Sequence, residues 1–507
     1  MEASRTENSS KTAFSGIINK ILTLILAFIS RKIFIQFIGI EYLGINGLFA
    51  NILTLLSLAD LGFGVAMNYS LYKPLAMKDE KTLAALIGFY RKIYNIIAIS
   101  VAILGLCLTP FLKFIINLDS NIPYVQGYYL IYLANTVISY LFVYKSSIIN
   151  ADQKGYKVNT VNTGINIGKV ILQIICIIIF KSYAVYALIE VLATLTNNVL
   201  ISSLANKLYP YILNDVPLND DQKRNIFTNL KSVFIYKLSG NIMTGTDSIL
   251  MSVLVSTAAV GLYSNYLTIT TTITTMITII FSSVTAAIGN LLVDRNTNNR
   301  LNVFKIIQMV GNFLSTYIGV CILILAQEFI SLWIGAQYKL DYMTVIAISL
   351  NLYFTICMQP LWTFRDASGL YQKTKYVMLI TAILNIILSI LLGKIYGVAG
   401  IVIATALSRL LTYFWYEPKL LFEIYFEKKS LGYYIDAFFN IMLMGICYFI
   451  SNIVCQYIEL YNGWIQWICK AIACSIIVIV IYFLRYFWTK EFLEMIKKLK
   501  KLLEKTK

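Results

Sequence analysis

Apolar stretches of about 20 residues, the length that crosses a bilayer as a helix, follow one another along almost this entire sequence. They begin near Phe14 and end near Trp488. Hydrophobic residues make up 58% of the 507 residues and charged residues only 13%, whereas a soluble domain carries about a quarter charged residues. The sequence therefore excludes a soluble globular protein and predicts an all-α, polytopic membrane protein.

Dividing the apolar runs at clusters of charged residues, glycine, proline and asparagine predicts about fourteen transmembrane helices. The first six lie at 14–37, 45–66, 86–112, 125–149, 158–180 and 183–205. After the polar segment 206–231, the others lie at 232–254, 262–290, 303–325, 342–364, 376–393, 397–415, 433–455 and 464–485.

Lysine and arginine are distributed unevenly over the connections between these predicted helices. Alternate connections hold most of them, for example Lys73, Lys78 and Lys81, whereas the remaining connections hold only Lys113, Lys181, Lys339 and Lys394. Because cytoplasmic loops are enriched in basic residues, we predict a multi-pass membrane protein with both termini cytoplasmic, and the family resemblance given below implies the cytoplasmic (inner) membrane. The net charge of +17 then reflects topology and contact with anionic lipids, and no nucleic-acid partner is expected.

The residue types and motifs that the sequence lacks limit the reactions that the chain can catalyse and the ligands that it can bind. The chain contains no histidine, which removes histidine general bases, histidine metal ligands and Ser-His or Cys-His pairs. The eight cysteines lie mostly inside apolar runs without C-x-x-C spacing, as small buried residues do. No phosphate-binding G-x-x-x-x-G-K-[ST] motif occurs. We therefore expect no cofactor, no metal and no enzymatic activity.

Three pairs of segments resemble each other at a spacing of roughly 215 residues. LGINGLFANI from Leu43 resembles VGLYSNYLTI from Val260, ADQKGYKVN from Ala151 resembles ASGLYQKTK from Ala367, and KSYAVYALI from Lys181 resembles KIYGVAGIV from Lys394. Chance similarity of apolar sequence is the alternative. The spacing predicts two six-helix lobes in parallel orientation around a central cleft, the arrangement of many transporters.

The repeat gives the predicted domain limits. The N-terminal lobe is 1–205, the cytoplasmic linker 206–231, the C-terminal lobe 232–416, the two additional transmembrane helices 417–488, and the basic amphipathic cytoplasmic tail 489–507. The tail spaces Phe492, Ile496, Leu499 and Leu503 at helical intervals with lysines between them. This pattern is typical of a helix on the surface of an anionic leaflet, and a solvated basic tail is the alternative.

Ionisable residues inside the predicted spans are candidates for function, because each costs about 2.5 to 3.5 kcal/mol at the bilayer centre unless it faces a cavity or a partner. In the first lobe these include Arg31, Lys32, Lys145 and Lys169. Facing a cleft, they would form a cationic cavity that binds phosphate or pyrophosphate.

Two carboxylates within the spans, Glu190 and Asp247, are candidates for binding a coupling ion, H+ or Na+. A purely structural pair between Lys169 and Glu190 is the alternative.

The threonine-rich run TITTTITTMIT from Thr268 suits a water-filled path or sugar hydroxyls. Its alternative is hydrogen bonding of each threonine to its own helix.

The stretch Glu41 to Asp79 contains the elements LGxxGLF, LADLGxGxA and LYKPLA. It resembles bacterial polysaccharide-export flippases, the Wzx-type O-antigen and capsule transporters of the multidrug/oligosaccharidyl-lipid/polysaccharide exporter superfamily. The resemblance implies two six-helix lobes and transfer of an undecaprenyl-pyrophosphate-linked oligosaccharide across the cytoplasmic membrane by alternating access. It also implies polymerase and chain-length proteins of the same pathway as partners, and Arg31 as a cavity-facing basic residue.

Two other functions remain open. An ion-coupled drug or metabolite exporter of the same superfamily would be favoured by clustered buried carboxylates, which are few here: Glu190, Asp247 and Asp60. A polytopic glycan polymerase or ligase would need a large outer loop with catalytic residues, and the predicted outer loops, such as 181–182 and 394–396, are short.

Overall fold

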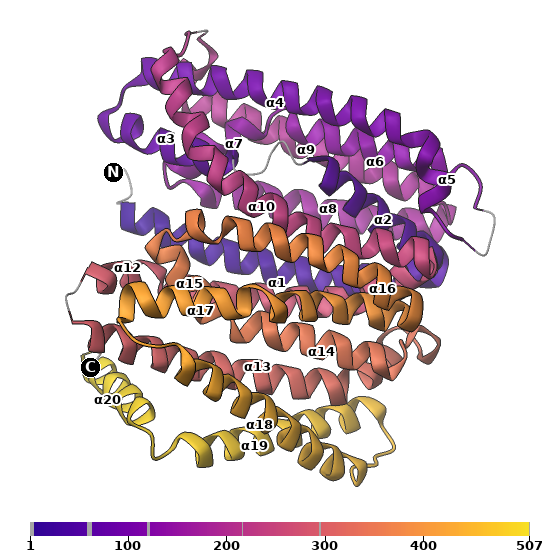
Figure 1. The fold of residues 1–507 in the computed structure, drawn as a ribbon. Helices are drawn as coiled ribbons and strands as arrows, with labels where there is room; N and C mark the ends of the chain where they lie inside the picture. The colour runs from indigo at the N-terminus through magenta and orange to yellow at the C-terminus, as the bar shows by residue number, and fades with distance from the viewer. Residues whose placement is uncertain (1–4, 58–62, 119–121, 215, 294–295, 506–507) are drawn as a thin grey trace. The chain divides into compact units, whose positions relative to one another are not determined.

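The structure is a computed structural model that describes residues 5–57, 63–118, 122–214, 216–293 and 296–505. Within these ranges every regular element is a helix (Figure 1). The predicted all-α, multi-pass architecture is therefore confirmed. Asp60 and most of the LADLGxGxA element lie outside the described residues.

Contacts between Cα atoms divide the chain into two compact units, Met1–Gly261 and Leu262–Lys507. Unit 1 contains α1 (Arg5–Phe37), α2 (Ile40–Leu56), α3 (Phe63–Met77), α4 (Glu80–Leu108), α5 (Leu112–Ile115), α6 (Val125–Tyr140), α7 (Val143–Ala151), α8 (Gly155–Phe180), α9 (Tyr183–Leu208) and α10 (Asp220–Leu254). It also contains the first turn of α11 (Thr257–Ser283).

Unit 2 contains the rest of α11 and the helices that follow it. These are α12 (Thr285–Val293), α13 (Thr297–Trp333), α14 (Tyr342–Cys357), α15 (Gln359–Ser368), α16 (Tyr371–Leu411), α17 (Tyr413–Leu421), α18 (Leu431–Gln456), α19 (Gly463–Tyr486) and α20 (Lys490–Lys505).

Nine helical segments among the described residues are long and apolar enough to cross a membrane, and one of them, Lys373–Phe426, covers two predicted spans. The predicted spans 14–37, 125–149 and 232–254 lie within α1, the α6–α7 pair and α10, whereas 45–66 overlaps most of α2 and only the first residues of α3, which continues to Met77. Since α10 starts at Asp220, its first turns occupy part of the segment predicted to be a polar linker.

The order of unbroken and broken helices repeats along the chain. The broken pairs α2–α3 and α6–α7 flank the long α4, and the broken pairs α11–α12 and α14–α15 flank the long α13. Corresponding helices begin roughly 215 residues apart, the spacing found in the sequence. This order supports the internal repeat, while the lobe limits 1–205 and 232–416 stay a prediction.

The helix α4 illustrates how the apolar sequence divides between core and lipid. Its N-terminus is capped by Asp79, whose side chain accepts a hydrogen bond from the Thr82 amide. Tyr90 and Val101 are fully buried, whereas Ile96 and Ile103 are more than half exposed. A helix that is apolar on all sides, with only one side buried, is typical of a membrane environment.

Two glycines related by the repeat allow α2 and the start of α11 to pack backbone against backbone. A Cβ atom added to Gly44 would lie 2.0 Å from the Thr257 carbonyl oxygen, and one added to Gly261 would lie 2.4 Å from the Ile40 carbonyl oxygen. The Thr257 amide also donates to the Asn117 carbonyl at 2.6 Å. These contacts explain why the start of α11 belongs to unit 1.

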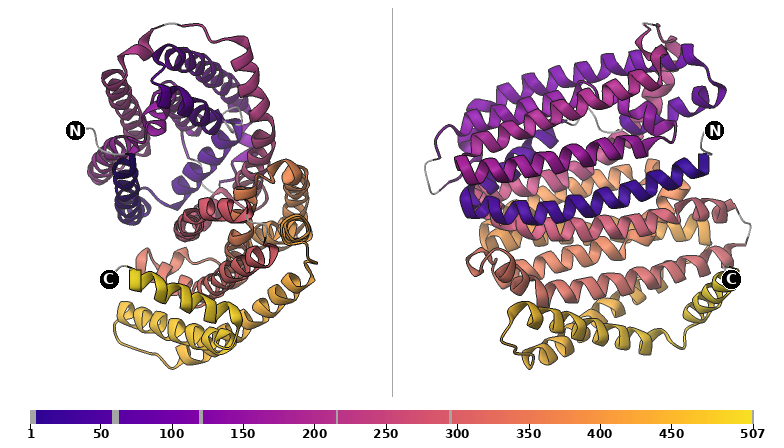
Figure 2. Two further views of the ribbon diagram at one scale, coloured as in Figure 1. Left: turned by 90° about the vertical axis from the view of Figure 1, so that its left-hand side faces the viewer. Right: turned by 180° about the vertical axis from the view of Figure 1, so that it is seen from behind.

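The two additional helices α18 and α19 pack along α13 within unit 2 (Figure 2). A polar network joins the three helices: Asn312 of α13 donates to Asp436 of α18, and Arg485 of α19 forms an ion pair with Asp436 at 2.9 Å. Asn312 is buried, whereas Arg485 and Asp436 are 30% and 40% exposed, so the network joins the three helices at the edge of their contact.

The long helix α16 is a hairpin whose two arms are the predicted spans 376–393 and 397–415. The backbone turns at Gly397, with φ 58° and ψ −132°, a conformation that favours glycine. A Cβ on Gly400 would lie 2.0 Å from the Leu392 carbonyl oxygen, so this turn has no room for a larger residue. A hydrogen bond of 3.0 Å from Asn385 to Thr405 joins the two arms.

Candidate functional site

Unit 1 contains two cavities that share Asn46 and Tyr186 in their linings. The larger cavity has a volume of about 580 Å³. Its polar lining consists of amides, hydroxyls and one carboxylate: Asn46, Thr54, Ser57, Tyr132, Asn135, Thr136, Tyr140, Tyr186, Glu190 and Asn241. Such neutral donors and acceptors suit hydrogen bonding to an uncharged polar ligand.

The smaller cavity has a volume of about 290 Å³ and carries the positive charge. Its polar lining contains Thr23, Ser30, Arg31, Asn46, Asn166, Lys169, Gln173 and Tyr186. The cations come from α1 and α8, which pack along each other. The Asn166 amide donates to the Thr23 hydroxyl at 3.2 Å across this contact.

An ion pair lies where the two cavities adjoin. The Lys169 Nζ is 3.0 Å from the Glu190 Oε1, and the Gln173 amide donates to the other Glu190 oxygen at 3.1 Å. The side chains of Lys169 and Glu190 remain 20% and 30% exposed. The pair anticipated as a structural alternative is therefore present, and both of its members also face a cavity.

The charges across the two cavities do not cancel. Arg31 and Lys169 line the smaller cavity, and Glu190 lines the larger one. This leaves one positive charge in excess near a hydrogen-bonding cavity. A guanidinium binds phosphate oxygens through two parallel hydrogen bonds, and an ammonium adds a point charge.

Tyrosine rings form part of the wall of the larger cavity. The rings of Tyr132 and Tyr183 stack with centroids 6.4 Å apart, and those of Tyr183 and Tyr186 stack at 6.2 Å. Tyr132 and Tyr186 also line the cavity. An aromatic ring beside hydrogen-bonding amides offers both an apolar face and polar contacts to a ligand.

The other predicted site residues lie outside the linings of these two cavities. Lys32 is exposed on α1, because neighbouring residues of a helix point about 100° apart and Arg31 takes the inward position. Lys145 is buried, and its Nζ donates to the Ser202 hydroxyl at 2.7 Å. Asp247 is buried on α10, beside the Ser248 hydroxyl, which accepts a hydrogen bond from Asn51.

The threonine run of α11 has the arrangement given as its alternative. The hydroxyls of Thr272, Thr274 and Thr275 each donate to the carbonyl four residues earlier, at 2.7 to 2.8 Å. These bonds satisfy the hydroxyls within their own helix, so the run needs no water path or sugar ligand to explain it.

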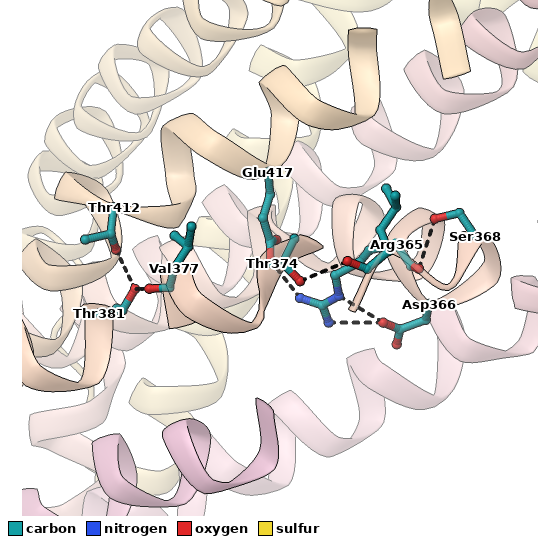
Figure 3. Close-up of polar contacts among 9 residues, drawn as sticks. Arg365, Asp366, Ser368, Thr374, Val377, Thr381, Thr412 and Glu417 are labelled. Carbon is teal, nitrogen blue, oxygen red and sulfur yellow. Dashed lines mark hydrogen bonds and ion pairs between the residues drawn. The ribbon is translucent and has the colours of Figure 1, made fainter. Parts of the chain in front are cut away.

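Unit 2 contains a second cluster of charged residues, and the ion pair at its centre is buried. Arg365 lies between Asp366 and Glu417, at 3.0 Å from a carboxylate oxygen of each (Figure 3). The Arg365 and Glu417 side chains are only 8% and 4% exposed. This pair joins α15 to α17 and has a structural role.

Several lining residues escaped the sequence analysis because they carry no charge. Asn46, Gln173 and Tyr186 are polar residues within spans, and the cost of burying a polar group without a partner is the signal that could have identified them. They are common enough in membrane helices that their position on one wall required the structure.

No protein-family model and no curated protein matches the chain. Among solved structures, the lipid II flippase MurJ in an inward closed conformation is 16% identical, with a TM-score of 0.70 over 94% of this chain and 98% of that chain. An inward-facing multidrug resistance MATE transporter of the MOP superfamily is 14% identical, with a TM-score of 0.61 over 76% and 91%.

A MOP superfamily transporter from Pyrococcus furiosus is 12% identical, with a TM-score of 0.56 over 81% of this chain and 93% of that chain. Together these similarities define the fold. The chain is an integral multi-pass membrane protein with the fold of MOP superfamily transporters.

Proposed function

We propose that the protein is a flippase that moves an undecaprenyl-pyrophosphate-linked oligosaccharide, an O-antigen or capsule repeat unit, across the cytoplasmic membrane by alternating access. The observation that carries the proposal is the pairing of a cationic cavity, with Arg31 and Lys169, and a cavity lined mainly by amides and hydroxyls, with Glu190 as its one carboxylate, in one unit. The proposed substrate has two corresponding parts, because its pyrophosphate is negatively charged and its sugar chain is polar.

In this proposal the pyrophosphate binds at Arg31 and Lys169. The Lys169–Glu190 pair is partly exposed, so an incoming phosphate competes with the carboxylate for the ammonium group. The sugars occupy the larger cavity, where amides such as Asn46 and Asn135 bond their hydroxyls and Tyr186 contacts the ring faces.

The solved lipid II flippase gives independent support, because a flippase with a similar fold acts on a lipid. We further propose that both termini are cytoplasmic and that the polymerase and chain-length proteins of the same pathway take up the product. Glu190 and Asp247 are the proposed sites for a coupling ion, H+ or Na+. We do not place Lys32 and Lys145 in the proposed phosphate site, because both lie outside the two cavity linings.

An ion-coupled drug or metabolite exporter is the second candidate, favoured by the MATE structures of similar fold. Such a function would use Glu190 as a proton or sodium site. The carboxylates within the spans are few, among them Glu190 and Asp247, and this favours the flippase, because clustered buried carboxylates would favour an ion-coupled exporter.

The decisive experiment compares cells with and without the gene. A flippase predicts loss of surface polysaccharide and accumulation of undecaprenyl-linked repeat units on the inner leaflet. Complementation with Arg31→Ala or Lys169→Ala should restore the protein to the membrane but not the surface glycan. Unchanged glycan in the deletion strain would contradict the flippase and favour the exporter.

A further inference from the structure

The larger cavity of unit 1 has little charge in its wall. Among its described lining residues, Glu190 is the only one whose side chain is charged at neutral pH. The other polar side chains there are amides and hydroxyls, which form hydrogen bonds and carry no net charge. A negatively charged group that enters this cavity therefore meets a carboxylate, and no lysine or arginine belongs to the described lining that surrounds it.

Glu190 lies where the larger cavity adjoins the smaller, cationic one. Its Oε1 is 3.0 Å from the Lys169 Nζ, and its Oε2 accepts a hydrogen bond from Gln173 at 3.1 Å. The Glu190 side chain is still 30% exposed, so a ligand can reach it. Glu190 therefore faces the part of a ligand that is joined directly to the group bound at Lys169.

The proposed substrate takes the cation away from Glu190. A pyrophosphate joined to a lipid at one end and to a sugar at the other carries one negative charge on each phosphate, and Arg31 and Lys169 supply one positive charge each. When Lys169 binds a phosphate, Gln173 remains as a hydrogen-bond donor to the Glu190 carboxylate. In that state further hydrogen-bond donors stabilise the carboxylate, whereas a second negative charge beside it is unfavourable.

A second acceptor in the larger cavity is Asn135 of α6. Its side-chain carbonyl oxygen is buried and has no hydrogen-bond partner among the described residues. A buried acceptor without a donor is destabilising, and an O–H or N–H group of a ligand would supply the donor. Asn135 and Glu190 thus both favour a ligand that donates hydrogen bonds.

We propose that Glu190 is a specificity-determining residue, which admits an uncharged, hydrogen-bond-donating sugar next to the pyrophosphate and excludes a sugar with a carboxylate at that position. Neutral hexoses and N-acetylated hexosamines donate through O–H and N–H groups, whereas a uronic acid places a second carboxylate beside Glu190. This specificity rests on the proposed function, because it requires the pyrophosphate at Arg31 and Lys169, and it adds the class of sugar that the site accepts.

The test measures binding to the full-length protein purified in detergent, with four short-chain isoprenyl pyrophosphates as probes. Three of them carry N-acetylglucosamine, glucose or glucuronic acid, and the fourth carries no sugar. We expect both neutral sugar probes to bind about tenfold more tightly than the glucuronic acid probe, because a like charge beside a carboxylate opposes binding. The readout is the ratio of the dissociation constants of the glucuronic acid and N-acetylglucosamine probes, since this ratio cancels effects on pyrophosphate binding and on folding.

Variants of the cavity wall should change this ratio in opposite directions. Glu190→Gln removes the charge and should bring the ratio close to one, whereas Glu190→Asp keeps the charge and should retain most of the preference. Asn135→Asp adds a carboxylate of nearly the same shape to the lining and should increase the preference for neutral sugars. The matched control is Asn150→Asp, at an exposed position of α7 outside both linings, which should leave the ratio unchanged.

The possible results separate this specificity from the proposed function. Equal binding of the neutral and glucuronic acid probes by the wild type would overturn the specificity, while the proposed function would stand because the pyrophosphates bind. A preference that Glu190→Gln and Asn135→Asp leave unchanged would show that these residues do not set it. Failure of all four probes to bind, including the one without a sugar, would contradict the proposed function itself and the specificity with it.

Discussion

The two units place a polar pair at equivalent points of the internal repeat, but with different chemistry. In unit 1 the pair is Lys169–Glu190, between α8 and α9, and its members are partly exposed to the cavities. In unit 2 the corresponding pair, roughly 215 residues later, is Asn385–Thr405 between the arms of α16. That pair is neutral, fully or almost fully buried and joined by a 3.0 Å hydrogen bond.

The same contrast holds for other charged groups. In unit 1, Arg31 lines a cavity, whereas in unit 2 Arg365 is enclosed with Glu417. A buried ion pair contributes little net stability because of its desolvation cost, yet removing one partner is expensive. The comparison teaches that one helical framework can bury charged residues in a contact between helices in one repeat and expose them to a cavity in the other.

Breaking the enclosed pair should have the largest effect on stability. Glu417→Ala leaves the Arg365 charge buried with a lost partner, and we expect a loss of about 3 to 5 kcal/mol in the free energy of unfolding. Glu190→Ala should cost far less, because water reaches Lys169 through the cavity. Thermal unfolding of the detergent-purified variants measures both. Equal losses would mean that the two pairs do not differ as described.

Neutralising the cavity pair should have the largest effect on transport. Lys169→Gln/Glu190→Gln imitates the neutral pair of unit 2, and we expect about a tenfold loss of surface glycan or more at unchanged protein level, because the ammonium that would bind phosphate is removed. The control Asn385→Ala removes the neutral hydrogen bond, which contributes about 1 kcal/mol to stability, and should leave transport intact. Wild-type export by the double variant would remove Lys169 from the site.

Substitutions at Arg31 sharpen the assignment of the smaller cavity. Arg31→Ala should abolish most export, while Arg31→Lys should retain part of it, because lysine keeps the charge but loses the two parallel hydrogen bonds. Lys32→Ala, next to it on the exposed face, is the matched control and should export normally. An identical loss in Arg31→Ala and Lys32→Ala would indicate an effect on the helix and not on the cavity.

The smallest expected effect on stability concerns two helix N-caps that occupy equivalent positions of the internal repeat, one in each unit. Asp79 caps α4, and hydrogen bonds from the Thr82 side chain and amide lower the pKa of Asp79 below its usual 3.8. Its stabilising contribution is fully present above that value and is lost as the pH falls through the lowered pKa. Asn296 caps α13 through the Asn299 amide and does not titrate.

Asp79→Asn should therefore make the melting temperature less dependent on pH below 4, by a small amount, while Asn296→Asp should make it more dependent. Melting curves at pH 3 and pH 6 compare the two variants with the wild type. A stronger pH dependence in Asp79→Asn would show that the carboxylate is not the titrating cap.

Much of the architecture could be predicted from the sequence because spanning length and apolarity are properties of single segments. Breaks of the helix within a predicted span were harder to predict from the sequence. The break between α6 and α7 falls at Leu141–Phe142, where no proline or glycine stands, so packing and not local chemistry sets it. The start of α10 at Asp220 was not predicted, because the charged residues there are typical of a loop. In this case a local sequence signal was present but misleading.

The candidate site was predictable in part. Charge within a span identified Arg31, Lys32, Lys145 and Lys169, and the family resemblance singled out Arg31, but only Arg31 and Lys169 line the cationic cavity. Lys145 has the same local sequence signal and instead contacts Ser202 of α9. Which face of a helix meets a cavity depends on the neighbouring helices, and that information is absent from any single segment.

The turn at Gly397 also sets a limit on motion. Its single non-helical residue gives the chain no slack between the two arms of α16, and hydrogen bonds such as Asn385–Thr405 hold the arms together along their length. The two arms must therefore move together as one rigid body in any conformational change. A tag or reporter inserted at this turn would push the arms apart, whereas one placed after α20 would leave the contacts between them intact.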